Sequence, residues 1–336
     1  MSFVEGLPKA ELHVHHVGSA SMQTVAELAE RHAGSTTVPT DPDALEKFFT
    51  FTDFGHFIEV YLSVVDLLRT PEDLWTLTYD VARDLTAQNV RYAELTCTPY
   101  TSIAVGISAE AYCEALEDAR RRAEADFGLT LRWIFDIPGE SGLPAADVTL
   151  DTALRLRPDS LVGFGLGGPE IGVTRPQFAP HFEQAIAAGL RSVPHAGEST
   201  GPETIWDSIN FLGAERIGHG IAAAQDPALM AHLAEHEITL EVCPTSNVRT
   251  RSVPSLAEHP LPQLVAAGVP VTINSDDPPM FGTTLNAEYE IARDLLGLDD
   301  AGVADLARAA VRASFAGDQV KRDLLAEIDA YTGGTA

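Results

Sequence analysis

Apolar runs typical of β-strands alternate with helical patterns along the whole chain, and this alternation restricts the fold more than any other feature. The runs are mostly apolar throughout, as strands of a parallel sheet covered on both faces should be. They occupy residues 11–15, 90–96, 129–137, 161–166, 190–195, 216–219, 239–242 and 269–274, with helical patterns such as 109–126 and 227–236 between them. Eight strands alternating with helices predict an α/β protein with a (β/α)8 barrel, whose active site gathers at the carboxyl ends of the strands.

One segment departs from this regularity. Residues 21–83 are too many for a single crossover helix, so we expect extra helices laid over the mouth of the barrel after the first strand. No linker, repeat or low-complexity tract divides the 336 residues. The sequence therefore predicts one domain spanning residues 1–336.

The composition restricts the partners and the compartment. A formal net charge of −27 argues against nucleic acid or an anionic membrane as a partner, because both require a basic surface. The three cysteines are isolated, which predicts no disulfide framework and fits a reducing compartment. The N-terminus has no signal pattern, and no apolar run approaches the ~20 residues of a membrane span. We expect a cytoplasmic enzyme with a small-molecule substrate.

Histidines and an aspartate stand at the ends of several predicted strands. His13 and His15 are one residue apart on the first strand and so point to one face, toward the barrel axis. His195 ends the fifth strand, and Asp276 follows the eighth. Three imidazoles and a carboxylate suit one Zn²⁺ ion with an open position for water. Alone, Asp276 could equally be a turn former or a helix cap, but its place beside the other three favours a ligand.

Two further residues are placed for proton transfer. Glu198 lies on the loop three residues after His195, and its carboxyl can act as an acid if its pocket keeps it protonated. As an alternative, Glu198 could cap the helix that follows. His219 stands between two glycines, which indicates close backbone approach, and it is well placed to deprotonate a metal-bound water. The other histidines are expected to be surface or satisfied residues.

Over essentially its full length, the chain resembles the adenosine deaminase family. The resemblance rests on several motifs in the family's order. They are PKAELHVH (residues 8–15), GLGGPE (165–170), HAGE (195–198), RIGHG (216–220), CPTSN (243–247) and SDDP (275–278). It implies hydrolytic deamination of a 6-aminopurine nucleoside with release of ammonia.

The resemblance also implies roles for individual residues. Zinc would be held by His13, His15, His195 and Asp276. Glu198 would donate a proton to purine N1, and His219 would handle the proton of the zinc water. Asp277 would contact N7, and the amide of Gly168 would contact N3.

One position departs from the family pattern. The first motif usually continues to an acidic residue, which in adenosine-specific members binds the ribose 5′-hydroxyl, but here that residue is Val17. Valine cannot accept a hydrogen bond, and an unpaired hydroxyl against it would cost ~1–3 kcal/mol. The substrate-binding set predicted from sequence is therefore Gly168, Asp277, His15 and Val17, with an apolar surface at the sugar's 5′ end.

This profile resembles the branch of the family that deaminates 6-aminodeoxyfutalosine, an adenine nucleoside with a 5′-linked aryl ketone bearing a benzoate, on a route to menaquinone. Two features fit it. An aromatic run (Phe48, Phe49, Phe51, Phe54 and Phe57) lies in the segment over the mouth, and Arg249 or Arg251 could pair with the benzoate. The aromatics could instead be core of that segment, and the arginines could be surface residues.

Three other functions compete with this interpretation. A plain adenosine deaminase acting on adenosine or 2′-deoxyadenosine is the main alternative. A two-metal hydrolase would need a carbamylated lysine at the end of a middle strand, and none of the three lysines (Lys9, Lys47 and Lys321) lies in such a strand. A non-catalytic metal- or nucleoside-binding barrel would not need Glu198 and His219.

Overall fold

The computed structural model describes residues 2–52 and 54–333 and contains the predicted barrel. Eight strands form one parallel sheet in sequence order, from β1 to β8. The strands are β1 (Lys9–His15), β2 (Val90–Cys97), β3 (Thr130–Pro138), β4 (Leu161–Gly167), β5 (Arg191–Ala196), β6 (Arg216–His219), β7 (Thr239–Val242) and β8 (Val271–Ile273). Each coincides with one of the predicted runs, although β8 is shorter than residues 269–274 and β1 begins two residues before residue 11. The fold class is confirmed.

The barrel closes between its last and first strands through the segment that follows β8. Val14 and Asp276 form an isolated parallel bridge. The backbone N–H of Asp276 donates to His13 O at 3.0 Å, and the N–H of His15 donates to Asp276 O at 2.9 Å. The backbone contacts that close the barrel therefore also bring Asp276 against His13 and His15.

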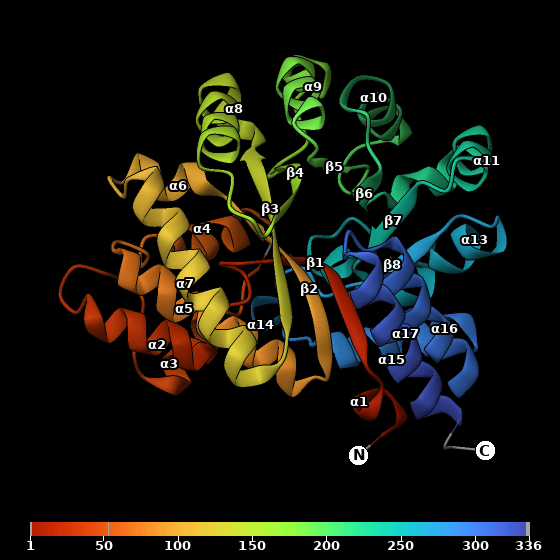
Figure 1. Ribbon diagram of the computed structural model, residues 1–336, viewed down its shortest axis with the longest axis horizontal. Helices are drawn as coiled ribbons and strands as arrows, with labels where there is room; N and C mark the ends of the chain where they lie inside the picture. The colour runs from red at the N-terminus through yellow and green to blue at the C-terminus, as the bar shows by residue number, and fades with distance from the viewer. Residues whose placement is uncertain (1, 53, 334–336) are drawn as a thin grey trace.

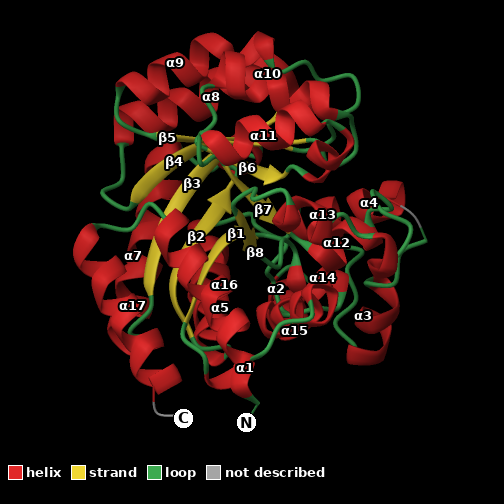
Figure 2. Cartoon of the chain, turned by 90° about the vertical axis from the view of Figure 1, so that its right-hand side faces the viewer, coloured by secondary structure: helices red, strands yellow, loops and turns green. Residues whose placement is uncertain are grey.

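Helices surround the strands on the outside, as Figures 1 and 2 show. After the first strand they are α2 (Met22–Arg31), α3 (Pro42–Phe48), α4 (Phe54–Val65) and α5 (Pro71–Ala87). The others are α1 (Phe3–Gly6), α6 (Pro99–Ala104), α7 (Ala109–Phe127), α8 (Gly142–Asp151), α9 (Ala179–Ala187), α10 (Pro202–Leu212), α11 (Pro227–Glu235), α12 (Pro244–Arg249), α13 (Leu261–Ala266), α14 (Pro278–Phe281), α15 (Leu285–Leu296), α16 (Asp300–Ala313) and α17 (Asp318–Gly333). Within the described chain, no helix combines the length and apolarity required to cross a membrane.

The predicted extra helices include α4, which covers part of the barrel mouth. Its Phe57 ring packs against Phe281 of α14, with ring centroids 4.8 Å apart. Phe51 packs against both Phe57 and Phe281, at 5.3 and 6.2 Å. Phe49 is buried as well, whereas the side chain of Phe54 lies outside the described part of the structure. The aromatic run thus forms an apolar contact between the first-strand insertion and the segment after β8.

Candidate active site

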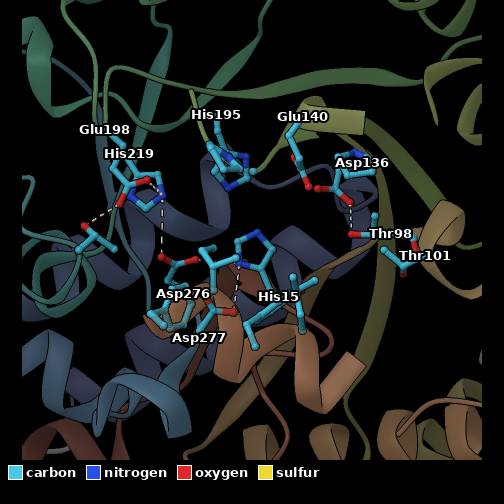
Figure 3. Close-up of a pocket in the computed structure, with 18 of the residues that line it drawn as sticks. His15, Thr98, Thr101, Asp136, Glu140, His195, Glu198, His219, Asp276 and Asp277 are labelled. Carbon is cyan, nitrogen blue, oxygen red and sulfur yellow. Dashed lines mark hydrogen bonds and ion pairs between the residues drawn. The ribbon is translucent and has the colours of Figure 1, made fainter. Parts of the chain in front are cut away.

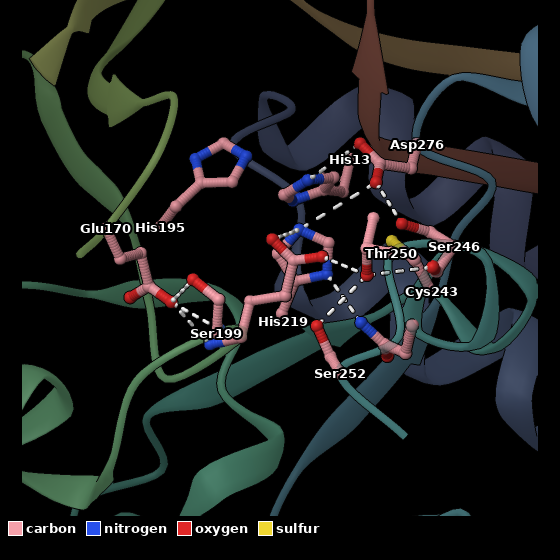
Figure 4. A network of polar contacts seen from close by, with 12 residues as sticks. His13, Glu170, His195, Ser199, His219, Cys243, Ser246, Thr250, Ser252 and Asp276 are labelled. Carbon is pink, nitrogen blue, oxygen red and sulfur yellow. Dashed lines mark hydrogen bonds and ion pairs between the residues drawn. The ribbon is translucent and has the colours of Figure 1, made fainter. Parts of the chain in front are cut away.

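The four residues predicted to bind metal lie together at the mouth of the barrel. His13 and His195 are buried with ring centroids 4.5 Å apart, and His15 lies 5.2 Å from His195. Asp276 Oδ1 lies 2.7 Å from His15 Nδ1 and 3.6 Å from His13 Nε2. Asp276 adopts a positive φ of 65°, an unusual conformation for a non-glycine residue. Figure 4 shows the side chains of His13, His195 and Asp276 directed toward one another, from β1, β5 and the segment after β8.

The unpartnered atoms of this group fit a divalent cation. His13 Nε2, His15 Nδ1, His195 Nε2 and Asp276 Oδ1 are buried without a hydrogen-bond partner. The 2.7 Å approach between His15 and Asp276 lacks hydrogen-bond geometry, as expected of two atoms that share one cation. An unpaired buried polar atom costs ~1–3 kcal/mol, and coordination would offset that cost at all four atoms. A site of three imidazoles and one carboxylate suits a transition metal such as zinc.

The outer nitrogens of two of these rings are already bonded, which leaves their Nε2 atoms toward the cavity. His195 Nδ1 lies 3.0 Å from Leu166 O, to which it can donate. His13 Nδ1 lies 2.8 Å from Glu241 Oε2, and Arg216 Nε donates to the other oxygen of Glu241 at 2.6 Å. Burial favours a protonated Glu241, but the charges of Arg216 and His13 hold its pKa below its ordinary value. An ionised Glu241 fixes the tautomer of His13, as is usual for metal-binding histidines.

Cys243 also lies near this group, with its sulfur within 4.8 Å of ligand atoms of His219 and Asp276. Burial raises the pKa of its thiol well above the ordinary value, and the charge of Asp276 acts in the same direction. A neutral thiol is a weak metal ligand. Cys243 is therefore a poorer candidate ligand than the four predicted residues.

Glu198 points into the same cavity from the loop after β5. Thr250 Oγ1 donates to Glu198 Oε1 at 2.9 Å, and Glu198 Oε2 lies 3.6 Å from His219 Nε2. Burial raises the pKa of the Glu198 carboxyl to about 8, and the charge of Asp276 adds to this shift. A carboxyl that keeps its proton at neutral pH can serve as an acid. The sequence analysis made an acid role for Glu198 depend on a pocket that keeps its carboxyl protonated. The pocket of Glu198 favours this protonated form.

A buried carboxylate that the sequence reasoning did not single out holds this loop. Glu170 accepts the backbone N–H groups of Gly197, Glu198 and Ser199 at 2.7, 2.9 and 2.6 Å. Arg175 pairs with Glu170 at 3.2 Å. Burial opposes ionisation of Glu170, but Arg175 and the backbone donors hold its pKa below the ordinary value. Glu170 ends the GLGGPE motif, two residues after Gly168. Its place in this motif was the sequence signal that could have identified it as a residue of the site.

His219 occupies a strained position between its two glycines, with φ at 60°. A Cβ on Gly218 would lie 2.7 Å from His13 Cε1, so the predicted close backbone approach is present. Burial lowers the pKa of His219 to about 4, which keeps the ring neutral. Its Nε2 lies 3.8 Å from Asp276 Oδ2 and so faces the metal-binding group.

A chain of hydrogen bonds on the far side of His219 defines its tautomer. The backbone N–H of Leu261 donates to His259 Nδ1 at 3.1 Å, so neutral His259 carries its proton on Nε2. That nitrogen lies 3.2 Å from Asn247 Oδ1, and Asn247 Nδ2 lies 3.1 Å from His219 Nδ1. With the Asn247 amide donating to Nδ1, neutral His219 carries its proton on Nε2, toward the cavity.

The cavity beside these groups is lined by residues from both halves of the barrel (Figure 3). They are His15, Phe57, Ile58, Tyr61, Leu62, Thr98, Thr101, Asp136, Pro138, Glu140, Gly168, Pro169, His195, Glu198, His219, Thr250, Asp276, Asp277 and Phe281. Gly168 and Asp277, both predicted to bind substrate, are among them. Burial raises the pKa of Asp277, and the charge of Asp276 acts in the same direction, which favours a form able to donate a hydrogen bond.

Val17, Arg249 and Arg251 are not in direct contact with this cavity. Val17 is 9% exposed and packs in the hydrophobic core beside Gly18, where a Cβ would overlap the Asp277 carboxylate. Arg249 Nε donates to Phe281 O at 3.2 Å, and Arg251 Nη2 donates to Thr52 O at 2.5 Å. Both arginines line a separate depression that reaches Phe281 from the other side. Neither arginine lines the cavity itself, so the pairing of Arg249 or Arg251 with a substrate carboxylate stays a prediction.

Comparisons with known proteins agree with this geometry. The model of the adenosine deaminase family matches residues 8–331. Aminodeoxyfutalosine deaminase of Streptomyces avermitilis is 66% identical over 333 residues, which cover 98% of this chain and 93% of that protein. The crystal structure of adenine deaminase from Arthrobacter aurescens matches with a TM-score of 0.91 and 32% identity, covering 97% of this chain and 99% of that one.

A solved amidohydrolase from Burkholderia ambifaria, with bound zinc, matches with a TM-score of 0.88 and 25% identity, covering 99% of this chain and 93% of that one. The family match extends over nearly the whole chain and includes every predicted ligand and both predicted proton-transfer residues. The chain belongs to the adenosine deaminase family.

Proposed function

We propose that this protein is a zinc-dependent deaminase of 6-aminodeoxyfutalosine that replaces the 6-amino group by an oxo group and releases ammonia. One observation carries the chemistry: a carboxyl that favours its protonated form, Glu198, shares a cavity with a group of unpartnered imidazole and carboxylate atoms. The substrate is supported by the name of the Streptomyces avermitilis relative and by the valine at position 17.

One zinc ion per chain would be held by His13, His15, His195 and Asp276. Bound zinc supplies Lewis acidity, which lowers the pKa of water toward ~7 and so makes a nucleophile available at neutral pH. Ser246 Oγ donates to Asp276 Oδ2 at 2.6 Å, which leaves Oδ1 for the cation. Glu241 would hold His13 in the tautomer that presents Nε2.

The purine would lie between the loops after β4, β5 and β8. Glu198 would donate its proton to N1, which makes C6 electrophilic, and the backbone N–H of Gly168 would contact N3. N7 carries no hydrogen, so a contact from Asp277 requires the protonated carboxyl, the form that burial of Asp277 favours by raising its pKa. Water adds at C6, a proton passes to the amino group, the C6–N bond breaks and ammonia leaves.

His219 would act on the attacking water. The sequence suggests that it removes a proton, but the bonds through Asn247 favour an Nε2–H that faces the reacting atoms. In that tautomer His219 would hold the oxygen by donating to it. A shift of the proton to Nδ1 would be needed before Nε2 could accept one.

The 5′ side of the sugar would lie toward the loop after β1, since Gly18 packs against Asp277. Val17 packs in the core behind this loop and does not line the cavity, so position 17 offers a free 5′-hydroxyl no hydrogen-bond acceptor. We also propose that residues 1–336 form one domain, because one hydrophobic cluster includes residues from Val4 to Ile328. We further propose that the enzyme acts in the cytoplasm, in menaquinone biosynthesis.

The decisive experiment compares kcat/KM for 6-aminodeoxyfutalosine, 5′-methylthioadenosine and adenosine, with ammonia release as the readout. We expect the first to exceed adenosine by at least about tenfold, the effect of one lost hydrogen bond. Higher efficiency on adenosine would instead establish a plain adenosine deaminase. No ammonia from any of the three would contradict the deaminase assignment itself.

A further inference from the structure

Two carboxylates in the cavity have no role in the chemistry described above. Asp136 lies two residues before the end of β3 and is 4% exposed, and Glu140 lies two residues after that strand. In Figure 3 they lie with Thr98 and Thr101 on the side of the cavity away from Glu198 and His219. We infer that Asp136 and Glu140 form a subsite that binds the vicinal 2′,3′-hydroxyls of a ribose.

The bonding of Asp136 leaves one oxygen for a ligand. Thr98 Oγ1 donates to Asp136 Oδ1 at 2.6 Å and so fixes the orientation of the carboxylate. No described residue donates to Oδ2, which lies 2.5 Å from the position that a Cβ on Gly167 would occupy. Glycine at 167 therefore leaves room for this oxygen at the cavity wall. Hydroxyl groups donate to carboxylates, and such charge-assisted bonds are stronger than neutral ones.

Glu140 stands beside the backbone that would contact the purine. Its Oε2 lies where a Cβ on Gly168 would be, and among the described residues no other side chain is recorded as a donor to this carboxylate. If the N–H of Gly168 contacts N3, the 2′-hydroxyl is the sugar group nearest that edge in the anti conformation of a nucleoside. Glu140 and Asp136 then lie where the sugar diol would enter.

The order of strands around the barrel supports the same orientation. The residues assigned to the base follow β4, β5, β6 and β8, whereas Thr98 follows β2, and Asp136 and Glu140 belong to the end of β3. A purine with N1 at Glu198 and N7 at Asp277 directs N9 toward the arc from β1 to β3. This step rests on the proposed function, and it places the diol at β2 and β3 and the 5′ group at β1.

The test measures binding of 6-oxopurine nucleosides that resemble the product, so it does not depend on turnover. Dissociation constants of inosine and 2′,3′-dideoxyinosine are measured by calorimetry with the metal-loaded full-length protein. We expect inosine to bind about 10- to 100-fold more tightly, the range for hydrogen bonds to a charged group. In Asp136→Asn this ratio should fall to about threefold or less, while binding of the dideoxy compound stays unchanged.

Glu140→Gln, at an exposed position, provides a second variant if Asp136→Asn does not fold, and it should also lower the ratio. Asp147→Asn on α8 is the matched control, because Asp147 bonds His181 outside the cavity, and it should preserve the ratio. Equal binding of inosine and its dideoxy analogue by the wild-type protein would overturn the subsite. So would an undiminished ratio in both Asp136→Asn and Glu140→Gln. Ammonia release from aminodeoxyfutalosine in the same preparation would show that the proposed function survives such a failure.

Discussion

The carboxylate of Glu170 accepts a 2.9 Å hydrogen bond from the backbone N–H of Glu198, and it also accepts the N–H groups on either side. Three consecutive backbone donors aimed at one buried anion fix the loop that carries Glu198, the proposed acid. Because Glu198 must meet N1 within hydrogen-bond reach, a small displacement of this loop should affect the rate more than the binding of metal.

We therefore predict that Glu170→Gln lowers kcat about 10- to 100-fold with zinc content unchanged, because the loop loses charge-assisted bonds. Steady-state kinetics and metal analysis measure the two effects. Glu203→Gln is the matched control, since Glu203 accepts only a 3.3 Å bond from Gly201 at the exposed end of the same loop. Loss of zinc together with rate in Glu170→Gln would contradict a positioning role.

Glu198 itself should be required for turnover and not for metal. Glu198→Gln cannot donate the proton, and we expect kcat to fall by about 100-fold or more with a full equivalent of zinc retained. The raised pKa of about 8 gives the direction of the pH dependence. The acid is active while protonated, so kcat should decline as the pH rises through this pKa, and the positive metal shifts the decline toward lower pH. A wild-type rate that rises continuously to pH 9 would contradict this assignment.

The proposed metal site predicts that removal of one ligand lowers the measured zinc content of the protein. His195→Ala removes one imidazole from the group of unpartnered atoms, and the purified protein should contain well under one equivalent of zinc. His181→Ala is a matched control, because this histidine bonds Asp147 away from the group. Full zinc occupancy in His195→Ala would refute the ligand set.

Glu241→Gln tests the support of His13. The change removes the charge that holds the ring, and we predict a zinc affinity about 10- to 100-fold lower, as is usual when such a partner is lost. Competition with a chelator measures the affinity. Glu117→Gln is the comparison, because Glu117 accepts a 2.8 Å bond from Trp133 at a distance from the metal group. An unchanged affinity would show that His13 does not depend on Glu241.

The barrel could be predicted because each of its strands depends on local sequence, and the candidate site residues could be placed at one mouth because they stand at strand ends. Histidines and acidic residues that end a strand can be recognised in the sequence, because they stand at the carboxyl ends of apolar runs. The roles of Glu170 and Glu241 could not be predicted in this way, since their partners lie 28 and 228 residues away and only the barrel brings them together. Asp136 could have been recognised from the sequence, because it lies near the end of a predicted strand, as His195 does. The pairing of an arginine with the substrate stays a prediction, since the sequence does not specify on which side of Phe281 the side chains of Arg249 and Arg251 lie.

Substitution of Val17 by a residue with a hydrogen-bond acceptor should shift the substrate preference toward adenosine. Val17→Asp introduces an acceptor into the loop after β1, behind the cavity, and with its carboxylate turned toward the 5′ end of the sugar the ratio of kcat/KM for adenosine to that for aminodeoxyfutalosine should rise about tenfold or more. The buried position also predicts a lower melting temperature, because an added carboxylate must be desolvated. Val17→Leu keeps the site apolar and should leave the ratio within about threefold of wild type. If Val17→Asp is too unstable to assay, Val17→Asn supplies a neutral acceptor with the same expected direction. An unchanged ratio in the aspartate or asparagine variant would show that position 17 does not discriminate at the 5′ end of the sugar. The preference for the substrate would then have to arise from the aromatic run over the barrel mouth.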